Sequence, residues 1–150
     1  SVITQNIDNL HQEAGSKTVY EFHGNSHSLE CTECNGIYKI SELDFDDLPV
    51  LCPRCEGLIK PGFIFFGEGI PHFAYEKSVE EAYKTDVMIL IGTTGEIVPA
   101  SYIPRMAKEN NANIIELNVE RSLFTDTITD IFIQEKASVS MNSIINKLDL

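Results

Sequence analysis

The sequence predicts an α/β fold built on a parallel sheet, with a small metal-binding insert. Segments with strand-like and helix-like patterns alternate along the chain, as in βαβ units. Residues 87–91 form an unbroken apolar run, which indicates a strand buried on both faces of a parallel sheet. Two Cys-x-x-Cys pairs interrupt this pattern within residues 31–55, so we expect a self-contained insert there.

The first quarter of the chain contains short elements. Residues 1–4 predict a short strand, and residues 8–15 predict one or two helical turns that stop at a glycine. Residues 19–23 are extended, since Val, Tyr and Phe favour strands. Residues 24–34 are expected to form a loop that enters a small strand.

The middle of the chain leaves the insert and returns to the main body. A turn or short helix is expected between the cysteine pairs, and residues 59–62 lead back. Residues 63–66 predict a strand that ends at a glycine, and residues 71–83 predict a helix that begins near a proline.

The last part of the chain alternates regularly. A strand at residues 86–92 is followed by a helix at 99–110, a buried strand at 112–117, a short strand at 130–133 and a closing helix at 137–148. The inward face of the closing helix is predicted to contain Val139, Ile144, Ile145 and Leu148.

Composition limits the classes of partner. The chain has 150 residues, enough for one domain with a core, and its 11 basic and 23 acidic residues give a net charge of −12. Phosphate contacts need clustered Lys and Arg, so we expect no nucleic-acid-binding surface. No apolar run approaches a membrane span, and no signal peptide is visible. The chain begins at Ser1 on a strand-like segment, which suggests that an upstream part is missing.

The four cysteines have the spacing of a zinc site. The pattern Cys31-x2-Cys34-x17-Cys52-x2-Cys55 lets two tight turns aim four sulfurs at one ion. Disulfides, free thiols, redox catalysis and a nucleic-acid-binding ribbon are the alternatives. Without a secretion signal the thiols indicate a reducing compartment, and we expect a cytoplasmic protein. Acidic neighbours oppose phosphate binding, so a closed structural zinc site is predicted.

A polar cluster and a histidine lie near the start. Gln5, Asn6 and Asp8 follow the first strand, and ligands bind at the carboxyl ends of strands in α/β sheets. Asp8 can instead cap the following helix. His23 precedes Gly24, and a neutral imidazole can accept a proton near neutral pH. A packed or surface histidine is the alternative.

Two later strand ends carry small and polar residues. The turn Gly92-Thr93-Thr94-Gly95 would let backbone N–H groups approach a phosphate or a ribose, although an ordinary turn has the same composition. Asn118 and Glu120 follow the next strand, where polar side chains either bind ribose hydroxyls or cap a helix. Together these strand ends suggest a nucleotide crevice.

In combination, these motifs resemble those of the sirtuins, the Sir2-type NAD-dependent protein deacylases. The resemblance covers nearly the whole chain and rests on Thr4-Gln5-Asn6-Ile7-Asp8, His11-x2-Ala14-Gly15, Glu21-x-His23-Gly24, the cysteine pattern, Pro61-x4-Phe66-Gly67-Glu68, Gly92-Thr93-Thr94 and Leu117-Asn118-Val119-Glu120.

The resemblance implies a Rossmann-like NAD-binding domain formed by residues 1–24 and 61–150, truncated at its N-terminal strand, and a zinc-ribbon subdomain at residues 25–60. It implies transfer of an acyl group from a lysine of a protein or peptide to the ADP-ribose of NAD, with release of nicotinamide. The family's glycine-rich NAD loop is absent and belongs upstream. Alternatives are a non-catalytic module that binds ADP-ribose or acyl-peptide, and mono-ADP-ribosyl transfer. The truncated sheet exposes an edge that could self-associate.

The resemblance also assigns roles to residues. His23 is the implied general base. The residues implied to contact nicotinamide and its ribose are Gln5, Asn6, Ile7 and Asp8. Those implied to border the NAD phosphates and ribose are Gly92, Thr93 and Thr94. Those implied to contact the adenosine half of NAD are Asn118, Val119, Glu120 and Ala137. The implied peptide-binding segment is Ile64, Phe65, Phe66, Gly67 and Glu68, which would add the substrate as a strand. Asn9 stands where the family usually has glycine.

Overall fold

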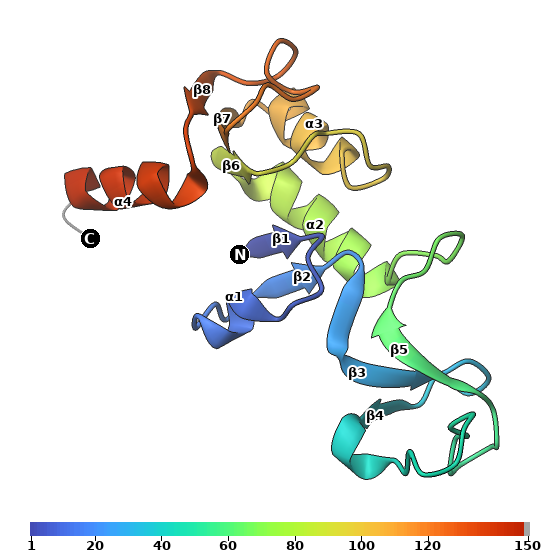
Figure 1. The fold of residues 1–150 in the computed structure, drawn as a ribbon. Helices are drawn as coiled ribbons and strands as arrows, with labels where there is room; N and C mark the ends of the chain where they lie inside the picture. Colours follow the sequence, from blue (N-terminus) through green and yellow to red (C-terminus); the bar gives the residue numbers. More distant parts are fainter. Residues whose placement is uncertain (149–150) are drawn as a thin grey trace. The chain divides into compact units, whose positions relative to one another are not determined.

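The structure, a computed structural model, describes residues 1–148 and divides into two compact units. The first unit is Ser1–Lys77, and the second begins at Ser78. The chain contains both helices and strands, and parallel strand pairs occur in both units (Figure 1). The predicted α/β class is therefore confirmed. The finer division into residues 1–24 with 61–150 and residues 25–60 stays a prediction.

The first unit opens with a parallel pair of strands. β1 (Val2–Thr4) pairs with β2 (Val19–Glu21), and α1 (Leu10–Glu13) connects them. The helix is shorter than predicted because Asn9 has φ 63° and ψ 8°, a left-handed conformation that cannot belong to a right-handed helix. Asparagine tolerates this region, which explains why it can occupy a glycine position.

An antiparallel sheet follows, with strand order β4-β3-β5. β3 (Gly24–Cys31) pairs with β4 (Ile37–Lys39) and with β5 (Ile59–Phe63), and a short 3-10 helix, Ile40–Glu42, follows β4. The loop predicted at residues 24–34 is therefore mostly strand.

The strand predicted at residues 63–66 is wrong, because the observed strand β5 ends at Phe63. Its pairing with β3 runs back towards the cysteines, with Pro61 opposite Leu29. Gly62 permits this close approach, since a Cβ there would lie 2.2 Å from the Ser28 hydroxyl. Backbone pairing thus outweighs the aromatic composition of residues 63–66.

The first unit is held together by aromatic packing. Phe22 is fully buried, and its ring meets Tyr75 of α2 (His72–Lys84) edge-on, with ring centroids 6.2 Å apart. Tyr20 of β2 meets Phe73 in the same manner at 6.3 Å. These pairs hold β2, directly before His23, against the start of α2.

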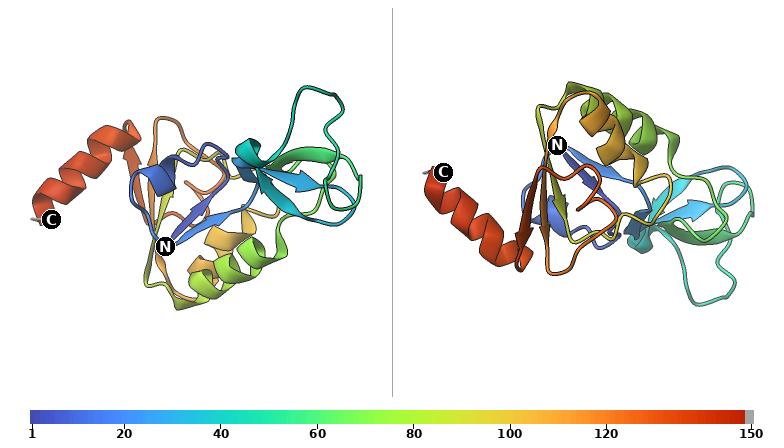
Figure 2. Two further views of the ribbon diagram at one scale, coloured as in Figure 1. Left: turned by 90° about the horizontal axis from the view of Figure 1, so that it is seen from below. Right: turned by 90° about the horizontal axis from the view of Figure 1, so that it is seen from above.

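The second unit contains a parallel sheet with order β6-β7-β8. Its strands are β6 (Val87–Ile91), β7 (Asn113–Asn118) and β8 (Ile131–Gln134), each close to its predicted limits. The helix α3 (Tyr102–Glu109) packs on β6 and β7 through Ile103 and Ala107, which are buried with Ile114 and Leu117 of β7 (Figure 2).

Two burial predictions for this unit are wrong. β6 was expected to be buried on both faces, but Val87, Ile89 and Ile91 are each at least 40% exposed while Leu90 is buried, because α3 covers one face only. The helix α4 (Ala137–Leu148) has its predicted limits, but its predicted inward residues Val139, Ile145 and Leu148 are exposed. It extends from β8 and buries Ser140 instead (Figures 1 and 2).

None of the helices in the described part of the chain combines the length and apolar character that crossing a bilayer requires.

Asp130 ties three elements of the second unit together. Asp130 directly precedes β8. Its Oδ2 accepts a hydrogen bond from the Ile114 N–H of β7 at 2.8 Å, and its Oδ1 accepts one from Lys108 Nζ of α3 at 2.5 Å. The Ile114 hydrogen bond, followed by the Lys108 hydrogen bond and charge, lowers the pKa of Asp130 below its ordinary value of 3.8.

We expect Asp130→Asn to remove an acid-dependent part of the stability. A carboxylate with a lowered folded-state pKa stabilises fully above its ordinary pKa and loses that contribution as the pH falls through the folded value. The wild type should therefore exceed the variant in unfolding free energy at neutral pH, and the difference should vanish in acid. Urea unfolding from about pH 2 to about pH 7 measures this. Asp44→Asn, in an exposed loop, is the control; a difference that grows in acid would contradict the prediction.

Candidate functional site

His23 lies at the junction between β2 and β3. Its Nδ1 is 3.0 Å from the carbonyl oxygen of Gln5, just after β1. Because a carbonyl can only accept, Nδ1 carries the proton in this hydrogen bond, and the neutral ring keeps its lone pair on Nε2. The half-buried ring is thus held in the tautomer suited to a general base.

The backbone around His23 is fixed on both sides. Its own carbonyl accepts a hydrogen bond from the Ile64 N–H at 2.9 Å. Gly24 has φ +66°, and a Cβ there would lie 2.1 Å from the carbonyl oxygen of Gly62. Only glycine fits this position, so the residue after His23 allows the backbones of β3 and β5 to approach closely.

Some residues of the polar cluster after β1 form hydrogen bonds within the fold, and others have exposed side chains. Asp8 Oδ1 accepts a hydrogen bond from the Leu10 N–H at 3.1 Å, but the N-cap of α1 is Asn9, so the prediction of Asp8 as the N-cap is wrong by one residue. The carbonyl of Ile7 accepts from the Ser26 N–H at 2.9 Å and from its hydroxyl at 2.8 Å. Asn6 and Asp8 are exposed, and Gln5 is half-buried beside His23. The structure therefore brings Gln5 and His23 together in one unit.

The predicted peptide-binding segment folds as a turn after β5. Glu68 Oε2 accepts hydrogen bonds from the Phe65 N–H at 2.8 Å and from Lys60 Nζ at 3.0 Å, and these hold the pKa of Glu68 below its ordinary value. Phe65 and Phe66 are exposed, and Phe66 is fully so. The segment thus presents an apolar surface beside a fixed carboxylate.

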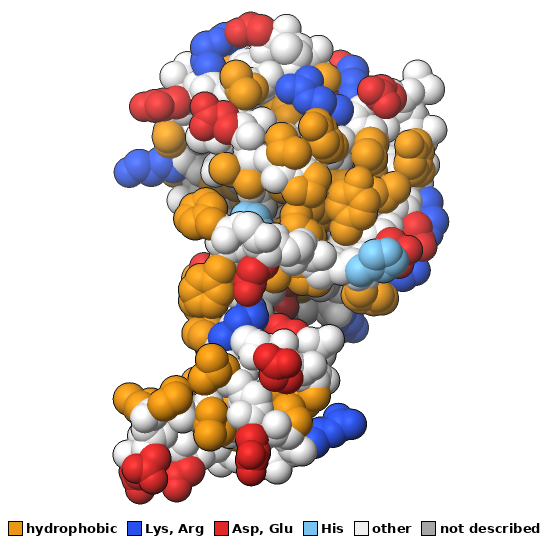
Figure 3. All heavy atoms as spheres, turned by 90° about the vertical axis from the view of Figure 1, so that its right-hand side faces the viewer, with side chains coloured by type: hydrophobic (Ala, Val, Ile, Leu, Met, Phe, Trp, Pro, Cys, Tyr) orange, Lys and Arg blue, Asp and Glu red, His pale blue; other side chains and the backbone are white. Residues whose placement is uncertain are grey.

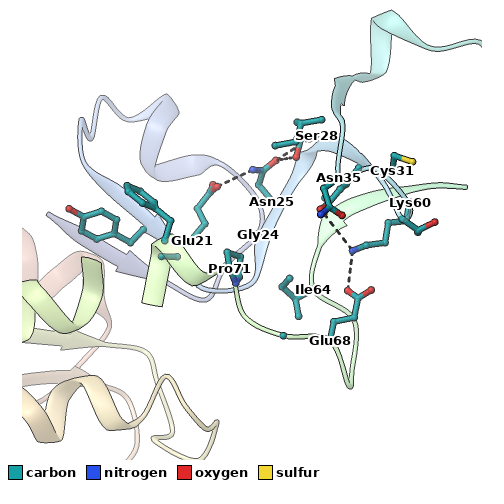
Figure 4. A pocket seen from close by; sticks show the side chains of 18 of the residues that line it. Glu21, Gly24, Asn25, Ser28, Cys31, Asn35, Lys60, Ile64, Glu68 and Pro71 are labelled. Atoms are coloured by element: carbon teal, nitrogen blue, oxygen red, sulfur yellow. Dashed lines mark hydrogen bonds and ion pairs between the residues drawn. The ribbon is translucent and has the colours of Figure 1, made fainter. Parts of the chain in front are cut away.

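A cavity of about 760 Å³ lies beside this turn, lined by residues of β2, β3, β5 and the start of α2 (Figure 4). Its polar side chains largely pair with one another: Asn25 Nδ2 donates to Glu21 at 2.9 Å, and Lys60 donates to Glu68. The first bond joins β3 to β2, and the second joins β5 to the turn that follows it.

The four cysteines converge at the far end of β3. Their sulfur atoms all lie within 4.8 Å of one another, with Cys31 to Cys55 at 3.5 Å and Cys34 to Cys52 at 3.7 Å. Four sulfurs bound to zinc at about 2.3 Å stand about 3.8 Å apart, so this set fits a tetrahedral zinc ion. Gly57 makes the approach possible, since a Cβ there would lie 2.9 Å from Cys31 Sγ.

Tyr38 supports the sulfur cluster from β4. Its hydroxyl donates a hydrogen bond to Cys52 Sγ at 3.0 Å, and this bond, with burial and the neighbouring thiols, raises the pKa of Tyr38 to about 12. Burial alone would raise the pKa of Cys52, but hydrogen bonds from Tyr38 and from the Arg54 and Cys55 backbone lower it to about 6. The lowered pKa favours the thiolate form of Cys52, which is the form in which cysteine binds metal.

Exposed acidic side chains surround the cysteines. Figure 3 shows red carboxylates over the lower part of the molecule, where the insert lies. The exposed acids of the insert are Glu33, Glu42, Asp44, Asp46, Asp47 and Glu56, against the exposed bases Lys39 and Arg54.

The second unit brings together its two predicted strand ends. Asn118 Nδ2 donates to the Thr93 carbonyl at 3.0 Å, and the Gly92 N–H donates to the Leu117 carbonyl at 3.1 Å. Gly92 has φ +61° and open space where a side chain would be, so the turn exposes its backbone.

The adenosine-side candidates lie at this same sheet edge. The Val119 N–H donates to Asn118 Oδ1 at 2.9 Å, and Val119 and Glu120 are exposed. The Glu135 N–H donates to the Asn118 carbonyl at 3.1 Å, which places the segment before Ala137 beside them. Within this unit the nucleotide-side candidates therefore form one group.

Sequence reasoning missed Glu116. This acid lies inside the apolar strand β7, is 1% exposed, and accepts hydrogen bonds from Ser122, Thr125 and Thr129. An acidic residue within a buried apolar run, followed by a segment rich in hydroxyl groups, was a visible signal.

Comparison with known proteins assigns the family. The sequence model described as "Sir2 family" matches residues 1–99. NAD-dependent protein deacylase 2 of Pyrobaculum aerophilum is 42% identical over 147 residues, 98% of this chain and 58% of the relative. An NAD-dependent protein deacylase of Aquifex aeolicus is 40% identical over 98% of this chain and 61% of the relative.

Solved structures agree. A structure described as Sir2 bound to acetylated peptide superposes with a TM-score of 0.90 at 29% identity, covering 99% of this chain and 63% of the other. A Sir2 homologue in complex with NAD gives 0.89 at 32% identity, covering 98% and 57%. The chain spans about three fifths of the length of the relatives it matches. With the sirtuin motifs, the cysteine cluster and these likenesses in agreement, the chain belongs to the Sir2 family.

Proposed function

We propose that the protein carrying this chain is an NAD-dependent protein lysine deacylase. The observation that carries the proposal is the hydrogen bond from His23 Nδ1 to the Gln5 carbonyl, which leaves Nε2 free to accept a proton. NAD would supply the ADP-ribose that receives the acyl group, with nicotinamide leaving. His23 would take the proton from a ribose hydroxyl at Nε2, so that the hydroxyl oxygen can attack the acyl carbon.

The other residues divide into a leaving-group side and a nucleotide side. Gln5, Asn6, Ile7 and Asp8 would hold nicotinamide and its ribose, as the exposure of Asn6 and Asp8 supports. Open backbone at Gly92 supports phosphate binding by the Gly92–Thr94 turn. The residues proposed for the adenosine half are Asn118, Val119, Glu120 and Ala137.

The substrate is an acylated lysine within a protein or peptide. Ile64, Phe65, Phe66, Gly67 and Glu68 would border it, supported by the exposure of Phe65 and Phe66. The insert, with four zinc-bound cysteines, would hold the fold without taking part in the chemistry. Its exposed acids disfavour nucleic acid as a partner.

The same proposal covers class and location. The proposed reaction makes the protein a transferase, because it moves the acyl group to ADP-ribose. It also makes the protein a hydrolase in the formal sense, because the amide bond of the acyl-lysine is broken. Four unpaired thiols suit a cytoplasmic protein. The exposed apolar side chains of β6 would let this chain self-associate at high concentration.

A binding module is the second candidate, favoured by the open backbone at Gly92, which would hold a phosphate of ADP-ribose without any reaction taking place. The test is incubation of the full-length protein with an acetyl-lysine peptide, with and without NAD, followed by mass spectrometry. We expect NAD-dependent loss of the acetyl group and one nicotinamide released per lysine. Zinc-loaded protein that binds ADP-ribose but leaves the peptide acetylated would establish the module instead, and ADP-ribose attached to protein would establish mono-ADP-ribosyl transfer.

A further inference from the structure

Glu116 is the most deeply buried ionisable side chain of the second unit's sheet that the proposed reaction does not use. It lies on β7, two residues before Asn118, and is 1% exposed. We propose that Glu116 is a positioning residue for the nucleotide, acting through the half-buried hydroxyl residues Ser122, Thr125 and Thr129 of the segment that follows β7. The inference rests on the proposed NAD site at Gly92–Thr94 and Asn118–Glu120.

Three hydroxyl groups converge on the Glu116 carboxylate. Ser122 Oγ lies 2.5 Å from Oε1, Thr129 Oγ1 lies 2.8 Å from Oε2, and Thr125 Oγ1 lies 2.9 Å from Oε2 and 3.1 Å from Oε1. Each hydroxyl donates to a Glu116 oxygen, so the orientation of all three side chains is set by the carboxylate. The carboxylate thereby holds residues 122–129 against the end of β7.

Two of these hydroxyls also organise the backbone around them. Ser122 Oγ accepts from the Phe124 N–H at 3.0 Å, and Thr125 Oγ1 accepts from the Ser122 N–H at 2.9 Å. A hydroxyl that donates one hydrogen bond becomes a stronger acceptor for the next N–H, so the bonds reinforce one another. The conformation of residues 122–125 therefore depends on the carboxylate.

This segment contacts the proposed phosphate turn directly. The Leu123 N–H donates to the Thr94 carbonyl at 3.0 Å. The Phe124 ring is buried against Gly95, where an added Cβ would lie 2.9 Å from Cε2 of the ring. A shift of residues 122–125 would thus move the Thr94 backbone.

Asn118 supplies the second connection. It follows Glu116 on the same strand and donates from Nδ2 to the Thr93 carbonyl at 3.0 Å. The adjacent carbonyls of Thr93 and Thr94 are therefore anchored by Asn118 and by the Glu116 network respectively. With both peptide groups fixed, the turn and the ribose-side residues are held in place before the nucleotide arrives.

The test uses the full-length protein and separates nucleotide binding from chemistry. We expect Glu116→Ala to raise the KM for NAD and the Kd for ADP-ribose about tenfold, because three hydroxyl groups lose their acceptor. The KM for the acetyl-lysine peptide and kcat at saturating NAD should stay within about twofold. Glu116→Gln keeps the shape and one acceptor oxygen and should give an intermediate value.

Thr125→Val is the second variant, since it deletes one hydroxyl at nearly constant volume and keeps the carboxylate. Thr125→Val should raise the KM for NAD and the Kd for ADP-ribose by a smaller factor. This variant tests the inference in the event that Glu116→Ala does not fold. Ile114→Val is the control, because Ile114 is buried on β7 and its side chain is outside the network. It should lower the melting temperature without changing the KM for NAD.

Unchanged NAD and ADP-ribose constants in Thr125→Val and Glu116→Gln would overturn the inference. An equal rise in Ile114→Val would also overturn it, since Glu116 would then be only a stabilising residue. If the unaltered protein deacylates the peptide and binds ADP-ribose, these outcomes leave the proposed function standing. If it does neither, the proposed function fails and the positioning role fails with it.

Discussion

Replacing His23 with alanine should reduce kcat for deacylation by about 10²- to 10⁴-fold, the usual contribution of a general base. The Nδ1 hydrogen bond to the Gln5 carbonyl fixes the ring, so the variant loses both the proton acceptor and its orientation. Steady-state release of nicotinamide from NAD, with an acetyl-lysine peptide and the full-length protein, measures the loss.

The reduction should occur without a comparable loss of stability. His23 is half-buried, and its backbone bond to Ile64 does not depend on the side chain. His72→Ala is a matched control because His72 is exposed on α2 and pairs only with Glu76 among the contacts described for it. Full activity in His23→Ala would remove this residue from the mechanism.

Removing zinc from the protein should unfold the insert. Structural zinc binds with apparent free energies of about 10–16 kcal/mol in small zinc domains, comparable to the whole stability of a typical domain. Without the ion, four sulfur atoms held within 4.8 Å of one another lose the group that joins the two Cys-x-x-Cys turns. We therefore expect chelation to lower the melting temperature by about 10 °C or more.

Cys34→Ser should reproduce this loss without a chelator, and Thr32→Ala, in the same turn, should have a much smaller effect. Hydrogen exchange should show fast exchange in β3, β4 and β5, which carry or flank the ligands. An unchanged melting curve after metal analysis shows that zinc is gone would contradict a structural role.

Local sequence patterns predicted the limits of most elements. β6 and α4 were predicted within one residue, because an uninterrupted apolar run and an amphipathic segment are strong signals. The cysteine spacing predicted the cluster, since two tight turns constrain four sulfurs whatever surrounds them. β5 was misplaced because its position depends on pairing with β3, and an aromatic run at residues 63–66 carries no information about that partner.

Burial and hydrogen bonding were harder to predict. The apolar residues of β6 and α4 suggested which side chains would be inside, but burial depends on which elements cover them. The sequence indicated His23 but not its link to Gln5, because that bond uses a backbone carbonyl that any residue would supply. The acid in the apolar run and the hydroxyl-rich segment after it marked Glu116 as unusual, but the sequence does not show that three of those hydroxyls donate to its carboxylate.

The way β3 pairs with its neighbours sets rules for exchanging inserts between relatives. β3 begins beside His23 and ends at a zinc ligand, and its register with β5 shifts between Gly24 and Leu29. A graft that cut within this strand and slipped by one residue would turn Cys31 away from the other sulfurs. Chimeric proteins should therefore be joined outside residues 24–63, so that both strands and their irregular register travel together.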